Sequence, residues 1–249
     1  MNLSLRMETV VSLVSPQSFA VADVGCDHAY VSIALIERGL ASKVIAMDVR
    51  KGPLEIAEAN ITNSGLHNVI SLRLSDGLEK LKPGEADTII LAGMGGLLIT
   101  EILERGQHII KDSKPSLILQ PQSELSHVRQ YILQQGYIIE EEKMLVEEGK
   151  YYTVIKAVPS EDSNAYVYTD ADYVYGYYNI VHHNPILYRY LEKERNVLTE
   201  IYDNLRIQRE KMLDKGKEMP EKTQIRMNEI MQELARNEEA MQRYKEVEA

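Results

Sequence analysis

Two carboxylates flank the turn that follows the first predicted strand. The segment DVGCDHA, residues 23–29, ends a strand predicted over Phe19–Cys26 and leads into a helix predicted over Tyr30–Arg38. A glycine in such a turn lets the backbone approach a ligand closely, and the helix N-terminus that follows offers free N–H groups. Asp27 could instead serve only as a helix cap. The turn is the first candidate ligand site.

The sign of the charge separates the ligands that this turn could hold. A dinucleotide-binding turn has the spacing G-x-G-x-x-G and holds a pyrophosphate, whereas here Gly25 stands alone between Asp23 and Asp27. Two negative charges disfavour a pyrophosphate and favour a cationic ligand such as S-adenosylmethionine, which has a sulfonium and an ammonium group. The turn therefore favours a methyltransferase over a dehydrogenase.

Acidic residues recur at the ends of the next two predicted strands. Asp48, followed by Val49, ends the second strand and could take both hydroxyls of a ribose, as an acid does in dinucleotide folds. Ser75-Asp76-Gly77 ends the third strand, where a carboxylate could accept a hydrogen bond from an adenine amino group. Because open α/β sheets bind ligands at this edge, the pattern indicates an adenosine-containing ligand.

The fourth predicted strand ends in Gly93-Met94-Gly95-Gly96. Methyltransferases that act on exocyclic amino groups often have an Asp or Asn, two prolines and an aromatic residue at this place. The glycine-rich sequence supplies none of these side chains, which argues against methylation of an amino group. It leaves room for a base or for the methionine part of the cofactor, although it could also be only a tight turn.

Short apolar runs alternate with amphipathic stretches over the first 159 residues, as in a parallel sheet covered on both faces. The predicted strands are Phe19–Cys26, Lys43–Val49, Asn68–Leu74, Asp87–Gly93 and Ser116–Gln122, and the predicted helices are Tyr30–Arg38, Pro53–Asn63, Leu97–Ile110 and Glu124–Gln134. Two further extended segments, 137–148 and 151–158, predict an antiparallel hairpin. Five βα units ended by a hairpin predict an α/β fold with the Rossmann-like sheet of class I methyltransferases.

The tail, residues 160–249, has a different pattern and predicts a separate C-terminal domain. A Tyr-rich segment, 166–185, predicts a structured connection. Beyond it, apolar residues recur at helical spacing on both sides of a break at residues 215–220, which predicts an antiparallel, coiled-coil-like helical hairpin. Such stripes more often pack against each other than carry chemistry. The catalytic domain would then span residues 1–159.

Composition excludes several classes of protein. The only cysteine, Cys26, excludes an intrachain disulfide and a Cys-rich zinc site, and the six histidines form no metal-binding pattern. No apolar run approaches the roughly 20 residues of a membrane span, and we expect no secretory signal in the N-terminal segment. We expect a cytoplasmic protein without a metal, as a monomer or weak dimer. The net charge of −10 implies that any nucleic acid is bound by a local patch or by shape.

The chain resembles the TrmK family, the bacterial tRNA (adenine(22)-N(1))-methyltransferases. The resemblance lies in NLSLR (2–6), DVGCDHAYVSIALIERG (23–39), AMDV (46–49), SDGL (75–78), GMGG (93–96), LQPQ (119–122) and the helical tail. It implies S-adenosyl-L-methionine as cofactor, tRNA as substrate, and a methyltransferase domain followed by a coiled-coil domain. The candidate cofactor-binding residues are then Asp23, Gly25, Cys26, Asp27, Asp48, Val49, Ser75, Asp76, Gly77, Gly93 and Met94.

The chemistry implied by this resemblance is simple. Adenine N1 has a lone pair and can attack the sulfonium methyl group without first losing a proton, so catalysis would come chiefly from holding the reactants in line. The product is a cationic base, which a nearby carboxylate would stabilise. Asp27 is the first candidate for that role, and His28 or Tyr30 could hold or stack the adenine. His28 is explained equally well as a helix-terminal residue bonded to backbone or solvent.

Binding of RNA would need basic residues in an acidic protein. The candidates are Arg6, Arg38, Arg50 and Lys51 near the ligand edge and Arg206, Arg209 and Lys211 near the bend of the hairpin. Because acids are interleaved with the latter three, a merely solvated helix face is an alternative. Two other functions stay open: a methyltransferase for a small molecule or a protein, and a non-catalytic nucleotide-binding module whose helical hairpin binds a partner.

Overall fold

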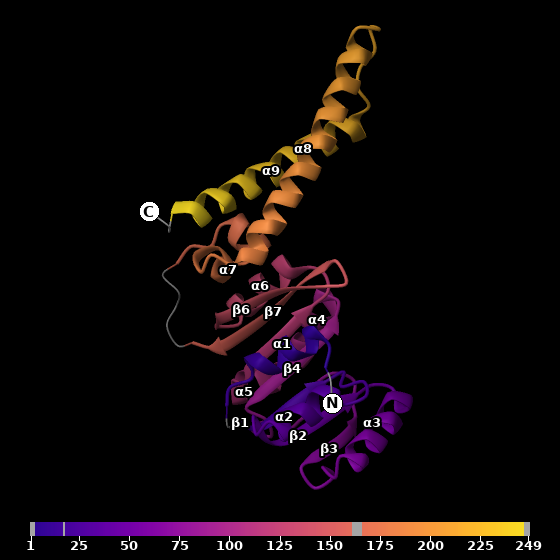
Figure 1. Cartoon of the computed structure of the whole chain (residues 1–249), viewed down its shortest axis with the longest axis vertical. Coiled ribbons are helices and arrows are strands. Elements are labelled where there is room, and N and C mark those ends of the chain that lie inside the picture. The colour runs from indigo at the N-terminus through magenta and orange to yellow at the C-terminus, as the bar shows by residue number, and fades with distance from the viewer. Residues whose placement is uncertain (1–2, 17, 161–165, 247–249) are drawn as a thin grey trace. The chain divides into compact units, whose positions relative to one another are not determined.

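The computed structural model describes residues 3–16, 18–160 and 166–246 and contains two compact units, Met1–Val167 and Tyr168–Ala249 (Figure 1). Asn2 of the NLSLR motif lies outside the described residues. The first unit is built on one sheet of seven strands in the order β3-β2-β1-β4-β5-β7-β6. Its strands are β1 (Ser18–Val24), β2 (Ala41–Asp48), β3 (Ile70–Leu74), β4 (Thr88–Met94), β5 (Ser116–Pro121), β6 (Tyr137–Glu147) and β7 (Lys150–Pro159).

The pairing of the strands confirms the predicted fold class. Strands β1 to β5 are parallel to one another, and β7 joins the sheet antiparallel to β5 with β6 on its outer side. The strand order reverses between β1 and β4, so the chain crosses from one half of the sheet to the other at this point. In open α/β sheets a ligand crevice forms at such a switch point.

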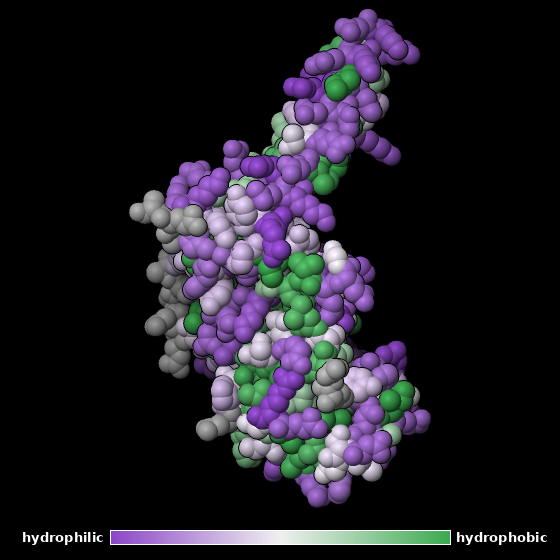
Figure 2. Space-filling view, in the orientation of Figure 1, coloured by the Kyte–Doolittle hydropathy of each residue, from purple (hydrophilic) through white to green (hydrophobic). Residues whose placement is uncertain are grey.

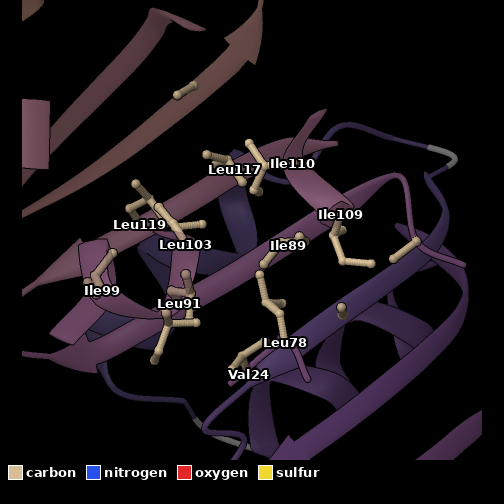
Figure 3. Close-up of a cluster of buried hydrophobic side chains, with 14 of the residues drawn as sticks. Val24, Leu78, Ile89, Leu91, Ile99, Leu103, Ile109, Ile110, Leu117 and Leu119 are labelled. Atoms are coloured by element: carbon tan, nitrogen blue, oxygen red, sulfur yellow. The ribbon is translucent and has the colours of Figure 1, made fainter. Parts of the chain in front are cut away.

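Helices cover both faces of the sheet because successive residues of a buried strand point to opposite sides. Helices α1 (Leu5–Leu13), α2 (Tyr30–Glu37) and α3 (Lys51–Asn63) share one apolar cluster with alternate residues of the strands, such as Val21 and Ile90. Helices α4 (Gly96–Arg105), α5 (Gln107–Ser113) and α6 (Leu125–Gln134) pack on the other face. Figure 3 shows this second cluster, in which Ile89 and Leu91 of β4 lie among side chains of α4 and α5.

Three features differ from the sequence prediction. Helix α1 was not expected; Ser4 caps it by accepting a hydrogen bond from the backbone N–H of Met7. The helix predicted over Leu97–Ile110 is broken at Gly106, where a Cβ would lie 2.4 Å from Leu78 Cδ1, so the chain turns where it packs closely. The connection from β3 to β4 forms turns without a helix, so five complete βα units are not present.

The second unit is helical throughout its ordered elements. A π-helical turn (Asp172–Gly176) and α7 (Tyr177–Val181) occupy the Tyr-rich segment, and α8 (Pro185–Leu213) and α9 (Glu221–Glu246) follow as the two predicted long helices. Asn184 caps α8 by accepting hydrogen bonds from the first-turn N–H groups, and Pro185 fits there because that position needs no donor. Among the described helices none is long and apolar enough to cross a membrane.

A buried polar network fixes how α8 and α9 pair. Glu194 of α8 accepts hydrogen bonds from the hydroxyl groups of Tyr175 and Tyr190 and from the amide of Asn237 on α9, at 2.6, 2.9 and 2.9 Å. Asn237 is fully buried and Glu194 partly buried, so the hydrogen bonds between them favour this register of the two helices. The visible outer surface of the hairpin is mostly hydrophilic, as Figure 2 shows.

One buried ion pair ties α6 to the hairpin of the first unit. Arg129 Nε lies 2.7 Å from Glu142 Oε1, and each residue is 2% exposed. Taking both charges out of water costs about as much as their attraction returns, so such a pair adds little net stability. Removing one partner, in contrast, leaves an uncompensated buried charge.

We predict that Arg129→Met lowers the free energy of unfolding of the first unit by about 3–5 kcal/mol, because Glu142 loses its partner. The double variant R129M/E142M regains most of that loss. The measurement is the urea dependence of thiol labelling at Cys26, which is the only cysteine and is 7% exposed. Equal losses in the single and double variants would contradict the prediction.

Candidate functional site

A cavity of about 500 Å³ opens at the carboxyl edge of the parallel strands, where the strand order reverses between β1 and β4. Residues that follow all five parallel strands line it, together with residues of α1 and α4. The lining includes every candidate cofactor-binding residue predicted from the sequence and the three candidate catalytic residues, Asp27, His28 and Tyr30. The topology thus brings the acidic strand ends together in one place.

The turn after β1 has an unusual backbone. Gly25, Asp27 and Ala29 all adopt left-handed conformations, with φ of +75°, +49° and +61°. Glycine adopts this conformation without strain at position 25, where a Cβ would also lie 2.3 Å from Met94 Cε and displace the end of that side chain. Left-handed residues other than glycine are strained and persist only where the surroundings hold them, as at ligand sites.

The end of β2 holds this turn in place. The N–H groups of Gly25 and Cys26 donate to the carbonyl oxygen of Met47 at 2.8 and 2.9 Å. The N–H of Asp27 donates to Asp48 Oδ2 at 3.3 Å, and that of Arg50 donates to Asp48 Oδ1 at 2.9 Å. Both oxygens of the Asp48 carboxylate are therefore fixed by backbone, facing the cavity at the end of the strand.

The alternative in which Asp27 caps α2 is wrong. Ala29 is the N-cap of this helix, and no described side chain donates or accepts a capping hydrogen bond there. The left-handed turn directs the Asp27 carboxylate elsewhere: its side chain is 57% exposed, and its Oδ1 lies 3.6 Å from His28 Nε2. His28 and Tyr30 form an edge-to-face pair with ring centroids 5.8 Å apart. The cavity therefore has a carboxylate beside two aromatic rings.

Asp23 is the buried acid of the site. It is 5% exposed and accepts a hydrogen bond from the hydroxyl of Ser32 at 2.6 Å. Burial raises the pKa of Asp23 from 3.8 to about 6 because the carboxylate loses its hydration; the hydrogen bond from Ser32 opposes the shift, and the nearby charge of Asp48 adds to it. An ionised Asp23 would be stabilised by a cation in the cavity.

Asp76 has a partner that the sequence did not reveal. The guanidinium of Arg105 at the end of α4 contacts both carboxylate oxygens, at 2.9 and 3.1 Å. These hydrogen bonds lower the pKa of Asp76, so this carboxylate stays ionised. Nothing in the spacing of residues 76 and 105 indicates the pair, because only the packing of α4 against the end of β3 creates it.

The β4 and β5 side of the cavity is built from glycines and amides. The N–H of Gly93 donates to Gln120 Oε1 at 3.1 Å, and the N–H of Gln122 donates to the carbonyl oxygen of Met94 at 2.8 Å. Both glutamines belong to the LQPQ motif, which contributed to the resemblance but was given no role. Sequence reasoning also missed the apolar lining from α1 and α4, namely Met7, Val10, Leu98 and Ile102.

The candidate RNA-binding residues are divided between several places. Arg6 and Arg50 line the cavity, whereas Lys51 and Arg38 do not, and Arg38 is held by Glu8 through two hydrogen bonds of 2.7 Å. Arg206, Arg209 and Lys211 are exposed residues of α8 in the other unit. Among the described residues no group of three or more His, Cys, Asp or Glu could hold a metal ion.

The pKa of Asp23 predicts a pH-dependent stability. Between about pH 4 and 6 Asp23 binds more protons in the folded protein than in the unfolded chain. Its contribution to the free energy of unfolding therefore decreases as the pH rises through this range. We expect Asp23→Asn to raise the free energy of unfolding by about 1–3 kcal/mol at pH 7.5 and to have little effect at pH 4. Urea titrations followed by circular dichroism measure both values, and equal gains at the two pH values would contradict this origin.

Comparison with known proteins agrees with the geometry of the site. Residues 3–155 match a family described as a methyltransferase domain. The chain is 40% identical over 166 residues to the tRNA (adenine(22)-N(1))-methyltransferase of Bacillus subtilis strain 168, an alignment that covers 67% of this chain and 69% of the relative.

Solved structures extend the similarity to the helical tail. The crystal structure of the B. subtilis m1A22 tRNA methyltransferase TrmK has a TM-score of 0.80 at 31% identity and covers 96% of this chain and 98% of that one. M. capricolum TrmK, in complex with the cofactor product S-adenosyl-homocysteine, has a TM-score of 0.79 at 26% identity over 97% and 99% of the two chains. The family match, the curated relative and the shared fold together show that the chain belongs to the TrmK family of tRNA methyltransferases.

Proposed function

We propose that this protein transfers the methyl group of S-adenosyl-L-methionine to N1 of the adenine at position 22 of tRNA. The observation that carries the proposal is the cavity at the switch point, into which three adjacent strand ends direct the acids Asp23, Asp48 and Asp76. An adenosine ligand with a cationic amino-acid part suits these acids in shape and charge. The target base follows from similarity to the B. subtilis enzyme.

The residues present fit this cofactor. Asp48, with both oxygens held by backbone N–H groups, keeps lone pairs for the two ribose hydroxyls, and Asp76 lies one strand further out for the adenine amino group. Gly25 and Gly93 leave the backbone bare where the amino-acid part must pass between β1 and β4. The buried Asp23 then faces the ammonium group, which compensates the charge that burial disfavours.

The proposed reaction requires no proton transfer by the protein. When bound, the cofactor supplies a methyl group on a positively charged sulfur. The N1 lone pair of adenine forms the new N–C bond as the C–S bond breaks, its electron pair stays on sulfur, and the positive charge moves to the base. Asp27, which is 57% exposed at the mouth of the turn, is placed to stabilise that charge.

The aromatic pair beside Asp27 gives the base a surface. His28 and Tyr30 meet edge to face and line the cavity, so one ring can stack on the adenine while the other supports it. The base leaves its stack in the tRNA to reach them, at a cost of a few kcal/mol that such contacts offset. Arg6 and Arg50, both on the cavity lining, are the nearest candidates for the flanking phosphates.

The helical unit and the location complete the proposal. Arg206, Arg209 and Lys211 are exposed on α8, where Arg206 also lies 3.2 Å from Asp203. We assign these three cations to contacts with the tRNA backbone, which are electrostatic and weaken with salt. Because the substrate is tRNA, the protein would act in the cytoplasm; a monomer or weak dimer stays a prediction.

The test of this function is transfer of labelled methyl from S-adenosyl-L-methionine to unmodified tRNA, with nucleoside analysis of the product. We expect 1-methyladenosine from tRNA with adenine at position 22 and none when that base is guanine. Asp27→Asn, which tolerates the left-handed backbone, should lower kcat by about 100-fold and change the affinity for S-adenosylhomocysteine by much less. Binding of the cofactor without methylation of any tRNA would disprove the proposed substrate.

Gly25→Ala tests the cofactor site directly. Its Cβ would lie 2.3 Å from Met94 Cε, so the Met94 side chain that lines the cavity must move, and we expect the affinity for S-adenosylhomocysteine to fall by at least about ten-fold. The matched control is Gly39→Ala, which has nearly the same backbone strain (φ +66°) but no described atom within 4 Å of its Cβ. Calorimetry measures both affinities; a similar decrease in the two variants would show that strain alone is responsible.

A further inference from the structure

Two side-chain amides line the cavity, and only one of them is free. Gln120 is 1% exposed; its Oε1 accepts from the N–H of Gly93, and its Nε2 donates to the carbonyl oxygen of Pro121 at 3.2 Å. Both ends of that amide are therefore used within the protein. Gln122 is exposed, and its side chain makes no hydrogen bond to any residue that the structure describes.

The Gln122 amide nevertheless has a defined place. The N–H of Gln122 is anchored to the carbonyl oxygen of Met94 at 2.8 Å, which fixes the backbone of the residue beside the end of β4. Its Nε2 lies 3.9 Å from the position that a Cβ of Gly93 would occupy. Because Gly93 has no side chain, the space next to the Gln122 amide stays open. Gln122 thus presents a donor and an acceptor to the cavity.

Methylation at N1 restricts how an adenine can be recognised. The Watson–Crick edge must stay open because N1 on that edge is the nucleophile. The other polar edge presents the N6 amino group as donor and N7 as acceptor, and a glutamine amide matches this pair with two hydrogen bonds. Carboxylates, hydroxyls and guanidinium groups of the cavity do not offer a neutral donor and acceptor side by side, and the two nitrogens of the His28 imidazole point in different directions.

We propose that Gln122 recognises the target adenine, with Oε1 accepting from N6–H and Nε2 donating to N7. The inference rests on the proposed function and names the residue that selects its base. Sheet order supports it: Asp23, Asp48 and Asp76 lie at the ends of β1, β2 and β3, whereas Gln122 follows β5 on the other side of the switch point. The cofactor's adenosine therefore occupies one side, and the β4–β5 side is left for the base.

The same contact assists the reaction. As N1 gains the methyl group, positive charge spreads over the ring and onto N6, so N6–H becomes a stronger donor. The hydrogen bond to Oε1 then strengthens on the way to the transition state, and such an interaction raises kcat rather than only lowering KM. The bond from Nε2 to N7 chiefly holds the base in line with the methyl group.

The experiment pairs a change in the protein with a change in the base. Wild type, Gln122→Ala and Gln122→Glu are assayed on two ligated tRNAs, one with adenosine and one with 7-deazaadenosine at position 22, which lacks the N7 acceptor. Gln134→Ala is the matched control, because Gln134 is an exposed glutamine at the end of α6 and does not line the cavity. Affinity for S-adenosylhomocysteine is measured for every variant.

We expect Gln122→Ala to lower kcat/KM on the adenosine tRNA by about ten-fold, as for loss of a bidentate base contact, with cofactor affinity unchanged. The ratio of kcat/KM on the adenosine tRNA to that on the 7-deazaadenosine tRNA should be higher for the wild type than for Gln122→Ala, because only the wild type loses a contact when N7 is replaced. Gln122→Glu should prefer the 7-deazaadenosine tRNA, since a carboxylate repels the N7 lone pair and still accepts from N6–H. Gln134→Ala should behave as wild type.

The decisive comparison is between the rate ratios that wild type and Gln122→Ala show on the two tRNAs. Any intrinsic effect of the base change on N1 reactivity is the same for both proteins and drops out of this comparison. The same ratio in wild type and Gln122→Ala would overturn the proposal, even if Gln122→Ala were slow, since Gln122 would then act without touching N7. A wild type that methylates neither tRNA would instead disprove the proposed function, and the two failures are therefore distinguishable.

Discussion

The backbone path of the turn after β1 governs the geometry of the whole site. The end of β2 holds it, because the N–H groups of Gly25 and Cys26 both donate to the carbonyl oxygen of Met47. Gly25, Asp27 and Ala29 are left-handed along this path, and only the first of them is a glycine. The path aims the N–H of Asp27 at the Asp48 carboxylate, so one turn positions two acids.

The cavity also has a shortage of positive charge. Four aspartates line it with two arginines, Arg6 and Arg50. Among the described residues Arg105 contacts Asp76 at two points, whereas Arg50 Nε lies 3.8 Å from Asp48 Oδ1. Asp23 shows the consequence, because burial raises the pKa of its carboxyl group to about 6. A site with this imbalance is costly to keep ionised when empty and is stabilised by a cationic ligand. The free energy of unfolding that the empty protein loses by burying these charges is regained when a cationic ligand binds.

The sequence was sufficient to predict the features that depend on local pattern. Apolar runs indicated the strands, and because parallel strands end at one edge, acids after three of them predicted the site. Features made by tertiary packing were beyond it. The pairing of Arg105 with Asp76 needs the packing of α4, and the break at Gly106 needs the side chain of Leu78. The sequence also does not distinguish the two glutamines of LQPQ. Only the structure shows that the Gln120 amide is hydrogen-bonded within the protein, whereas the Gln122 side chain faces the cavity.

Methyl transfer moves a positive charge from sulfur to the base without creating or removing one, and this divides the polar residues into two groups. Asp23 and Asp48 line the cavity, and in the proposed function they face parts of the cofactor whose charge does not change, so they would hold the ground state and the transition state equally. Only groups near the base meet a charge that grows during the reaction. In the proposed function the acids of β1 and β2 would determine whether the cofactor binds. Asp27 and the Gln122 amide beside Gly93 would instead set the rate, and the sequence alone did not single out Gln122.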